Sequence, residues 1–320
     1  MPSRKAYKEL LASKWVWKPG KCQCGGSFAA VSWKTCNSRG FGRLFYRCED
    51  CESFKDVMNF SALPTLRWPI VHYWFFLQQW FANSKRPSSE EIARMMGVSG
   101  QACSAARRLG EVLLRAEALC AQKTQDSRKL SGLLEVDGTS IRKFVLPGST
   151  TLRYTQYFGA LKRGTRCIHL YRLPDADSKS FGKPPPESFA RIQKTDFMRQ
   201  VLPMTPGLGK TSLISDGAPP AYLKLCPELK VLHRACCHSK GQFVERSRIH
   251  GLRTEVHTGG IDSCWKLCKA AIPPSVLTKS DGSFNPKIDV YIRSWQWRWE
   301  NTTCTNLCKK TAQVYLRQDA

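Results

Sequence analysis

Two aspartates of this chain each end a short, mostly apolar run and precede a glycine. Asp137 follows residues 133–136, and Asp216 follows residues 212–215. A carboxylate in a buried strand is costly unless it is paired or binds a cation. Two such carboxylates suit a pair of hard divalent cations, Mg²⁺ or Mn²⁺, which can promote cleavage of a phosphodiester bond. An Asp-Gly pair is also a common turn, so both interpretations stay open.

A third aspartate, Asp262, lies in a predicted helix over residues 259–269. The apolar residues of that helix follow the i, i+3, i+4, i+7 spacing of a stripe that faces a sheet: Ile261, Cys264, Trp265 and Cys268. Asp262, Lys266 and Lys269 share the adjoining face. That face would place a carboxylate near bound metal ions and two lysines near DNA phosphates. The alternative is an ordinary surface ion pair between Asp262 and Lys266.

Four cysteines near the start of the chain have the spacing of a zinc ribbon. They form two pairs, Cys22 with Cys24 and Cys48 with Cys51, and the first pair is followed by two glycines. Such turns can present four thiolates to one structural Zn²⁺. The first pair has one intervening residue where two are usual, so Cys36 is an alternative ligand. Free thiols are the competing interpretation.

The segment from residue 88 to 114 has the pattern of a helix-turn-helix. Ser88 or Ser89 can cap a first helix, Gly97 can end it in a tight turn, and a second helix follows over residues 102–114. The second helix of this motif lies in the major groove of DNA. Its candidate DNA-binding residues are Gln101, Arg107 and Arg108. An ordinary helical hairpin would have the same pattern.

The region beyond residue 130 has the succession of short apolar strands and helices that is typical of an α/β domain. Its predicted elements follow in the order strand, strand, strand, helix, strand, helix, strand, helix. This order is typical of ribonuclease H-like folds, which have a mixed five-stranded sheet with flanking helices. In those folds the first and fourth strands are neighbours. We therefore expect Asp137 and Asp216 to face each other.

Composition and charge favour a nucleic-acid partner. The 320 residues contain 50 Lys and Arg against 25 Asp and Glu, which leaves a formal charge of +25, and 42% of them are hydrophobic. Such a surface attracts polyanions, and the apolar content is sufficient for folded cores. A basic start and the length of the chain favour a reducing compartment over a secreted disulfide scaffold. No apolar stretch reaches the length of a membrane span, so we expect no membrane association.

The region from about residue 130 to 301 resembles the catalytic domain of Merlin-type DDE transposases and their bacterial insertion-sequence relatives. The matching segments follow the family's order along the chain: Glu135 to Gly138, Ser215 to Gly217, His238 to Val244, Val256 to Asp262 with Trp265 and Lys269, and Tyr291-Ile292 leading to Trp297-Arg298. A zinc ribbon and a helix-turn-helix upstream also occur in such proteins. The resemblance therefore covers most of the chain.

The resemblance implies a cut-and-paste transposase. It implies that Asp137, Asp216 and Asp262 hold two Mg²⁺ ions and that the chain binds terminal inverted repeats and target DNA as an oligomer. We expect a zinc-ribbon-like domain over residues 1–62, a helical DNA-binding region over 63–127 and a catalytic domain over 128–320. Tryptophan and cysteine content favours a eukaryotic nucleus, although a bacterial nucleoid would require the same charge.

The sequence departs from the family pattern at the third acid. Gly259 and Asp262 stand where the family has Asn and Glu, and Ser294 stands where the family tends to have Glu. These departures favour one rival, a catalytically inactive DNA-binding protein derived from a transposase. A ribonuclease H-like nuclease acting on RNA or hybrids is a second rival. His238 and His257 match family positions and are candidate accessory groups, although a single histidine is more often structural.

Overall fold

A computed structural model of the chain describes residues 2–29, 32–35, 42–66, 68–82, 87–97, 101–146, 148–178, 185, 188–201, 211–217, 220–237, 241, 244–249, 252–277, 283–302 and 306–316. Cys36, His238 and the side chain of Gln101 lie outside these described residues. The chain forms two compact units, Met1–Cys120 with Asn301–Ala320, and Ala121–Glu300. The long helix α4 (Gln101–Ser127) begins in the first unit and ends in the second. None of the described helices is long and apolar enough to cross a membrane.

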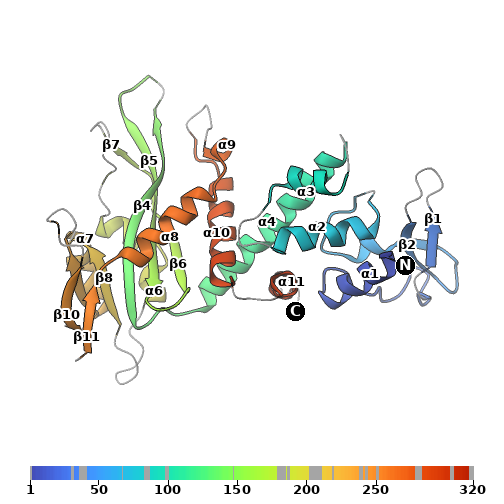
Figure 1. Ribbon diagram of the computed structural model, residues 1–320, viewed down its shortest axis with the longest axis horizontal. Helices are drawn as coiled ribbons and strands as arrows, with labels where there is room; N and C mark the ends of the chain where they lie inside the picture. Colours follow the sequence, from blue (N-terminus) through green and yellow to red (C-terminus); the bar gives the residue numbers. More distant parts are fainter. Residues whose placement is uncertain are drawn as a thin grey trace. The chain divides into compact units, whose positions relative to one another are not determined.

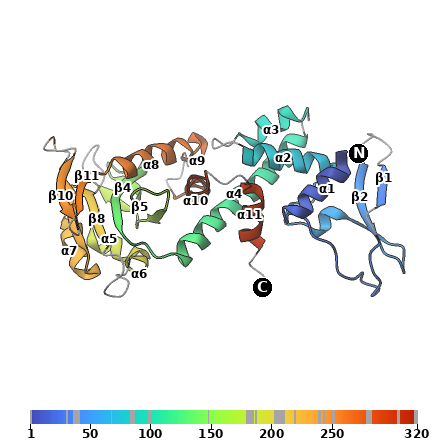
Figure 2. The same cartoon turned by 60° about the horizontal axis from the view of Figure 1, so that its bottom comes forward.

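The first unit contains a small antiparallel sheet and several helices. Its other elements are α1 (Pro2–Ala12), β1 (Ser32–Thr35), β2 (Gly42–Arg47), β3 (Phe54–Asp56), η1 (Val57–Phe60), α2 (Ile70–Ala82), α3 (Ser89–Met95) and α11 (Leu307–Leu316). The strands pair in the order β1-β2-β3. The C-terminal helix α11, drawn in red in Figures 1 and 2, belongs to this unit. The indole Nε1 of Trp15 lies 3.1 Å from Cys308 Sγ, and the Cys120 thiol contacts the carbonyl oxygen of Thr311 at 3.4 Å.

The second unit is a mixed α/β structure built on one mixed sheet. Its strands are β4 (Leu133–Val145), β5 (Leu152–Lys162), β6 (Ile168–Arg172), β7 (Ala176–Ser178), β8 (Ser212–Asp216) and β9 (Leu232–Cys236). They follow the order β6-β5-β4-β8-β9, with β7 paired to β5 outside this path. β5 is antiparallel to β4 and β6, whereas β4, β8 and β9 are parallel to one another.

The sheet has six strands where the sequence predicts five. The additional strand β7 pairs with the first residues of β5. A bidentate ion pair joins β5 and β7, because Arg153 donates to both carboxylate oxygens of Asp177 at 2.8 and 3.0 Å. β7 has three residues, too few to show strand alternation in the sequence.

Helices cover both faces of this sheet, and the strands alternate between two cores. The remaining elements are α5 (Phe189–Gln193), α6 (Phe197–Gln200), α7 (Pro220–Leu229), β10 (Glu245–Ile249), β11 (Leu252–Val256), α8 (Gly259–Ala270), α9 (Pro274–Leu277) and α10 (Lys287–Glu300). On β5, Phe158 and Ala160 pack in one core with residues of α5 to α7. Leu161 on the other face packs with residues of α8, α9 and α10. Successive side chains of a strand point to opposite faces, which explains the division.

The helix α8 confirms the amphipathic pattern of its sequence. All four residues of the predicted stripe are buried and pack against the sheet: Ile261, Cys264, Trp265 and Cys268. The contact with β5 is close, because a Cβ at Gly159 would lie 2.6 Å from the ring of Trp265. Burial raises the pKa of the Cys264 thiol to about 12, so this cysteine stays neutral and packs as an apolar side chain.

Candidate functional site

Asp137 and Asp216 lie at corresponding positions on neighbouring parallel strands. Leu134 pairs with Leu213 and Val136 pairs with Ser215 in the register of β4 and β8, so the next step along both strands reaches the two aspartates. Both side chains are half-buried. Asp137 is also the partner of Gly159 on β5, which places it on the face that α8 covers. The neighbouring positions expected from the sequence are thus confirmed.

The N-terminal end of α8 lies at the same end of the sheet. Cys236 pairs with Asp216 in the register of β8 and β9. Burial raises the pKa of the Cys236 thiol, and the charge of Asp216 raises it further, whereas hydrogen bonds with Thr258 lower it. Thr258 is the residue that precedes α8. One thiol therefore interacts with Asp216 and with the start of the helix that carries the third aspartate.

Asp262 lies in the first turn of α8 and is exposed. Its backbone N–H donates to the carbonyl oxygen of Thr258 at 3.0 Å, and the Thr258 hydroxyl donates to its carboxylate at 3.2 Å. The structure therefore brings Asp262 toward the strand ends that carry Asp137 and Asp216. Within the described part of the chain, however, these three carboxylates do not form a group whose ligand atoms all lie within 4.8 Å of one another.

Glu135 is a site residue that our sequence interpretation did not single out. It lies on β4 two positions before Asp137, and its side chain is buried. One carboxylate oxygen accepts the backbone N–H of Ile261 at 3.0 Å, and the other accepts from Arg163 Nε at 3.0 Å. A negative charge at this position interacts favourably with the N-terminus of a helix. The carboxylate thus attaches α8 to the strand that carries Asp137.

Arg163 extends this attachment to the segment before α8. Its guanidinium donates to the backbone carbonyl oxygens of Glu255 and His257, the latter at 3.2 Å, as well as to Glu135. Strand β11 and the start of α8 are therefore held at the Glu135 end of β4. The signal for Glu135 was present in the sequence as a second carboxylate, two residues before Asp137 and on the same side of the strand.

The predicted phosphate-binding lysines and histidines differ in their surroundings. Lys266 and Lys269 are exposed on α8. His257 accepts the backbone N–H of Gly259 through Nδ1 at 3.3 Å, an interaction within the first turn before α8. His233 Nε2 lies 2.8 Å from the Ser215 hydroxyl, and burial lowers the pKa of His233. Neutral histidine at this position is consistent with a structural hydrogen bond.

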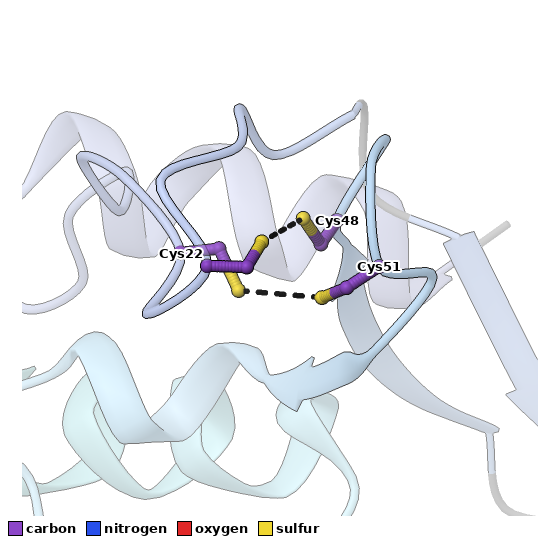
Figure 3. Close-up of side chains that lie close together, drawn as sticks. Cys22, Cys48 and Cys51 are labelled. Atoms are coloured by element: carbon purple, nitrogen blue, oxygen red, sulfur yellow. Dashed lines mark hydrogen bonds between the residues drawn. The ribbon is translucent and has the colours of Figure 1, made fainter.

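The four cysteines of the first unit come together as the sequence predicts. Cys22 Sγ lies 3.7 Å from Cys51 Sγ, and Cys24 Sγ lies 3.5 Å from Cys48 Sγ. All four sulfur atoms lie within 4.8 Å of one another. Four sulfurs bound to one tetrahedral zinc ion would lie roughly 3.8 Å apart. Figure 3 shows the sulfur atoms of Cys22, Cys48 and Cys51 pointing into one space between two loops.

The local backbone explains how the unusually short first pair reaches this geometry. Gly25 has a φ of +91°, which favours glycine, and its N–H donates to the carbonyl oxygen of Cys22 at 2.9 Å. A Cβ at Gly26 would lie 2.9 Å from Cys48 Sγ and 2.5 Å from Asp50 Oδ2. The two glycines therefore permit a tight turn and a close approach of the two loops. This cysteine group provides four sulfur ligands without Cys36 and could bind a metal ion such as zinc.

Helices α3 and α4 contain the segment expected to form the helix-turn-helix. Ser88 caps α3, since its hydroxyl accepts the backbone N–H of Glu91 at 3.1 Å, and Gly97 after the helix has a φ of +66°. The second helix is longer than predicted, because α4 continues to Ser127. Arg107 is exposed and forms an ion pair with Glu90 of α3, with Nε 2.6 Å from Oε1. Arg108 is exposed on the same helix.

The continuation of α4 has a clear cause in its side chains. Its buried residues recur at helical spacing well beyond the predicted end at residue 114: Leu109, Leu113, Ala116 and Cys120. Gly110 does not interrupt the helix. It allows α3 to cross, because a Cβ at Gly110 would collide with the Ser89 side chain.

A comparison of the chain with protein-family models and with curated proteins finds no match.

Proposed function

We propose that this chain is a DDE-type DNA transposase that binds the terminal inverted repeats of its element and cleaves and joins DNA. The observation that carries the proposal is the placement of Asp137 and Asp216 at corresponding positions of neighbouring parallel strands. Two acids so placed, with a third at the start of a helix across the same strand ends, fit phosphodiester chemistry better than a purely structural role.

We infer that the second unit has a ribonuclease H-like fold. The strand order β6-β5-β4-β8-β9 supports this inference, together with a second strand antiparallel to its neighbours and parallel fourth and fifth strands. If β7 is left out and the other strands are numbered along the chain, their order across the sheet is 3-2-1-4-5. The additional hairpin β10–β11 lies between β9 and α8.

The oxygen ligands at the candidate site suit hard divalent cations. Two Mg²⁺ ions held by Asp137, Asp216 and Asp262 would supply Lewis-acid chemistry at the reacting phosphate. To share two ions, the three carboxylates would have to lie closer to one another than the 4.8 Å grouping that they do not form. Glu135 and Arg163 position the helix that carries Asp262, and Lys266 and Lys269 are available for DNA phosphates.

The reaction would take place in two substitutions at phosphorus. Water first attacks a phosphodiester at the element's end, so that a P–O bond forms and the bond to the 3′ oxygen breaks. The released 3′ hydroxyl then attacks a phosphodiester of target DNA and displaces a target 3′ oxygen. The two ends of an element must be processed together, so we propose that the chain works at least as a dimer.

The first unit would recognise the DNA. The cysteine group, bound to zinc, would stabilise a small loop-rich domain, and α3 with the first half of α4 would contact the terminal repeats. The formal charge of +25 supports a polyanionic partner. In a eukaryotic host such an enzyme would act in the nucleus.

The test is divalent-dependent nicking of DNA that carries the terminal repeats flanking this chain's coding sequence. We expect the wild type to nick this DNA with Mg²⁺ or Mn²⁺, and Asp137→Asn and Asp216→Asn to bind it without nicking. Lys194 is exposed and directly follows α5, so Lys194→Gln serves as a control variant that should nick at the wild-type rate. Nicking by both aspartate variants at the wild-type rate would overturn the assignment.

A second candidate is a DNA-binding protein derived from a transposase that no longer catalyses the reaction. Two observations favour it: the third acid is Asp262 rather than Glu, and the three carboxylates are not gathered within ligand distance of one another. Specific binding to the terminal repeats without nicking under any divalent ion would favour this candidate over the enzyme.

A further inference from the structure

The hairpin β10–β11 has one buried face and one strongly basic face. Ile249 and Val256 are buried and pack with Ile214 and Cys236 of the main sheet. The alternation of side chains therefore places the neighbouring positions on the opposite, exposed face: Arg246, Arg248, Arg253 and Glu255. In both views the hairpin, drawn in orange, lies beside β8 (Figures 1 and 2).

Two arginines of this face are direct cross-strand partners. Arg248 on β10 pairs with Arg253 on β11 in the register of the hairpin. Like charges directly opposite each other destabilise a strand pair. Arg246 has a carboxylate partner, Glu255, with Nε 3.7 Å from Oε1. Within the described ranges, neither Arg248 nor Arg253 forms an ion pair that would offset this repulsion.

An open cavity of about 530 Å³ lies over these arginines. Its lining consists of Arg246, Ser247, Arg248, Arg253, Thr254 and Glu255. Guanidinium groups present planar, forked donors that match two oxygens of a phosphate. The donors in this cavity outnumber its single carboxylate, which favours an anionic ligand.

The hairpin is attached to the candidate catalytic region on both strands. The buried Ile249 and Val256 pack in one cluster with Ile214, which lies two residues before Asp216 on β8. Arg163, which pairs with Glu135, also donates to the backbone of Glu255. A nucleic-acid strand bound to the hairpin would therefore be held at a fixed position relative to Asp216.

We propose that Arg248 and Arg253 form a clamp for the phosphates of a DNA strand. This inference rests on the proposed function, because it assigns the clamp's ligand to the DNA that the enzyme processes. A phosphate bound between the two guanidinium groups would interact favourably with both and offset the repulsion between them. The clamp contacts the backbone and reads no bases.

The experiment measures how the affinity for a fluorescein-labelled duplex depends on salt, using the full chain. The test variant is Arg248→Gln/Arg253→Gln. Its matched control, Lys194→Gln/Arg199→Gln, removes the same charge from exposed positions at α5 and α6, which cover the other face of the sheet. Losing two phosphate contacts should lower the slope of log K against log salt by about 1.8, at about 0.9 per contact.

We expect the reduced slope in the hairpin variant and the wild-type slope in the control. The melting temperature of the hairpin variant should be equal to or above that of the wild type, because the substitution removes a repulsion. Equal slopes in both variants and the wild type would overturn the clamp while the proposed function stands. An equal reduction in both variants would also overturn it, since the effect would be one of overall charge. A wild type that does not bind DNA would overturn the proposed function as well.

Discussion

The carboxylate of Glu135 accepts a hydrogen bond from the backbone N–H of Ile261 at 3.0 Å, and so joins β4 to the first turn of α8. The same carboxylate forms an ion pair with Arg163, and only 3% of its side chain is exposed. Asp137 lies two residues farther along β4, and Asp262 follows Ile261. One buried charge therefore links the two elements that carry Asp137 and Asp262, two of the three candidate catalytic residues.

Replacing Glu135 should destabilise the attachment of α8 to β4, and the loss should be smaller when the new side chain keeps a hydrogen-bond acceptor. Glu135→Ala leaves Arg163 without its buried partner and should lower the free energy of unfolding by about 3–5 kcal/mol. Glu135→Gln keeps an oxygen acceptor for the Ile261 N–H and should cost less. Denaturant unfolding of the full chain measures both. Equal stability of the two variants would contradict a role for the hydrogen bond to α8.

Two adjacent glycines at the start of α8 provide a matched steric test. A Cβ at Gly260 would lie 2.6 Å from Glu135 Oε2, whereas at Gly259 the nearest atom, His257 Nδ1, is 3.5 Å away. Gly260→Ala should therefore lower the free energy of unfolding by about 1–3 kcal/mol. Gly259→Ala should leave it within about 0.5 kcal/mol of the wild type. The close packing of α8 on Glu135 would be disproved by a neutral Gly260→Ala variant.

The cysteine group should bind one zinc ion per chain, measured by elemental analysis of protein purified without added metal. Cys24→Ser and Cys51→Ser each remove one sulfur ligand and should lower both zinc content and the stability of the first unit. Cys167→Ser makes the same substitution in the second unit, outside the group, and should leave zinc content unchanged. Full zinc content in the Cys24→Ser variant would show that this thiol is not a ligand.

A buried histidine should make the second unit sensitive to acid. Burial, together with the charge of Arg128, lowers the pKa of His169 to about 3. Arg128 Nε donates to His169 Nε2 at 3.1 Å, so the folded protein holds the neutral ring. Because the unfolded chain takes up this proton first, the stability contributed by the neutral ring is complete above pH 6.5 and is lost as the pH falls from about 6.5 toward 3.

The measurement compares the wild type with His169→Gln, which does not titrate. The wild type should be the more stable at pH 7, and its advantage should shrink by about 3 kcal/mol by pH 4, at about 1.4 kcal/mol per unit. Unfolding by denaturant at a series of pH values gives both curves. An advantage that stays constant over this range would rule out the depressed pKa.

The third acid can be tested by changing its charge and its length separately. If Asp262 is a metal ligand, Asp262→Asn should lower divalent-dependent nicking by about 100-fold or more. Asp262→Glu keeps the charge, extends the side chain by one methylene toward the strand ends, and should retain nicking. Asp262 is exposed, so neither substitution should disturb folding, which circular dichroism of both variants checks. Wild-type nicking by the asparagine variant would exclude Asp262 from the site.

Local patterns determined much of the architecture. The stripe on α8, the serine cap of α3, the paired cysteines and the apolar runs of β4, β5 and β8 follow from residue types at short spacing, because helix and strand geometry repeats over a few residues. The order of these elements also led to the expected neighbours, Asp137 on β4 and Asp216 on β8, and the structure confirms that the two strands pair.

Contacts between distant segments decided the rest. Sequence patterns did not predict the hydrogen bond between Glu135 and Ile261, the strand β7 or the arginine pair of β10–β11. The predicted end of α4 was too early, since the apolar stripe that continues the helix is buried by segments remote in sequence, including Thr311 next to Cys120. Only the tertiary structure shows that the Glu135 carboxylate interacts with the N-terminus of α8, because the partners of a carboxylate depend on strand register and helix packing. These are set by the burial of whole faces and not by neighbouring residues.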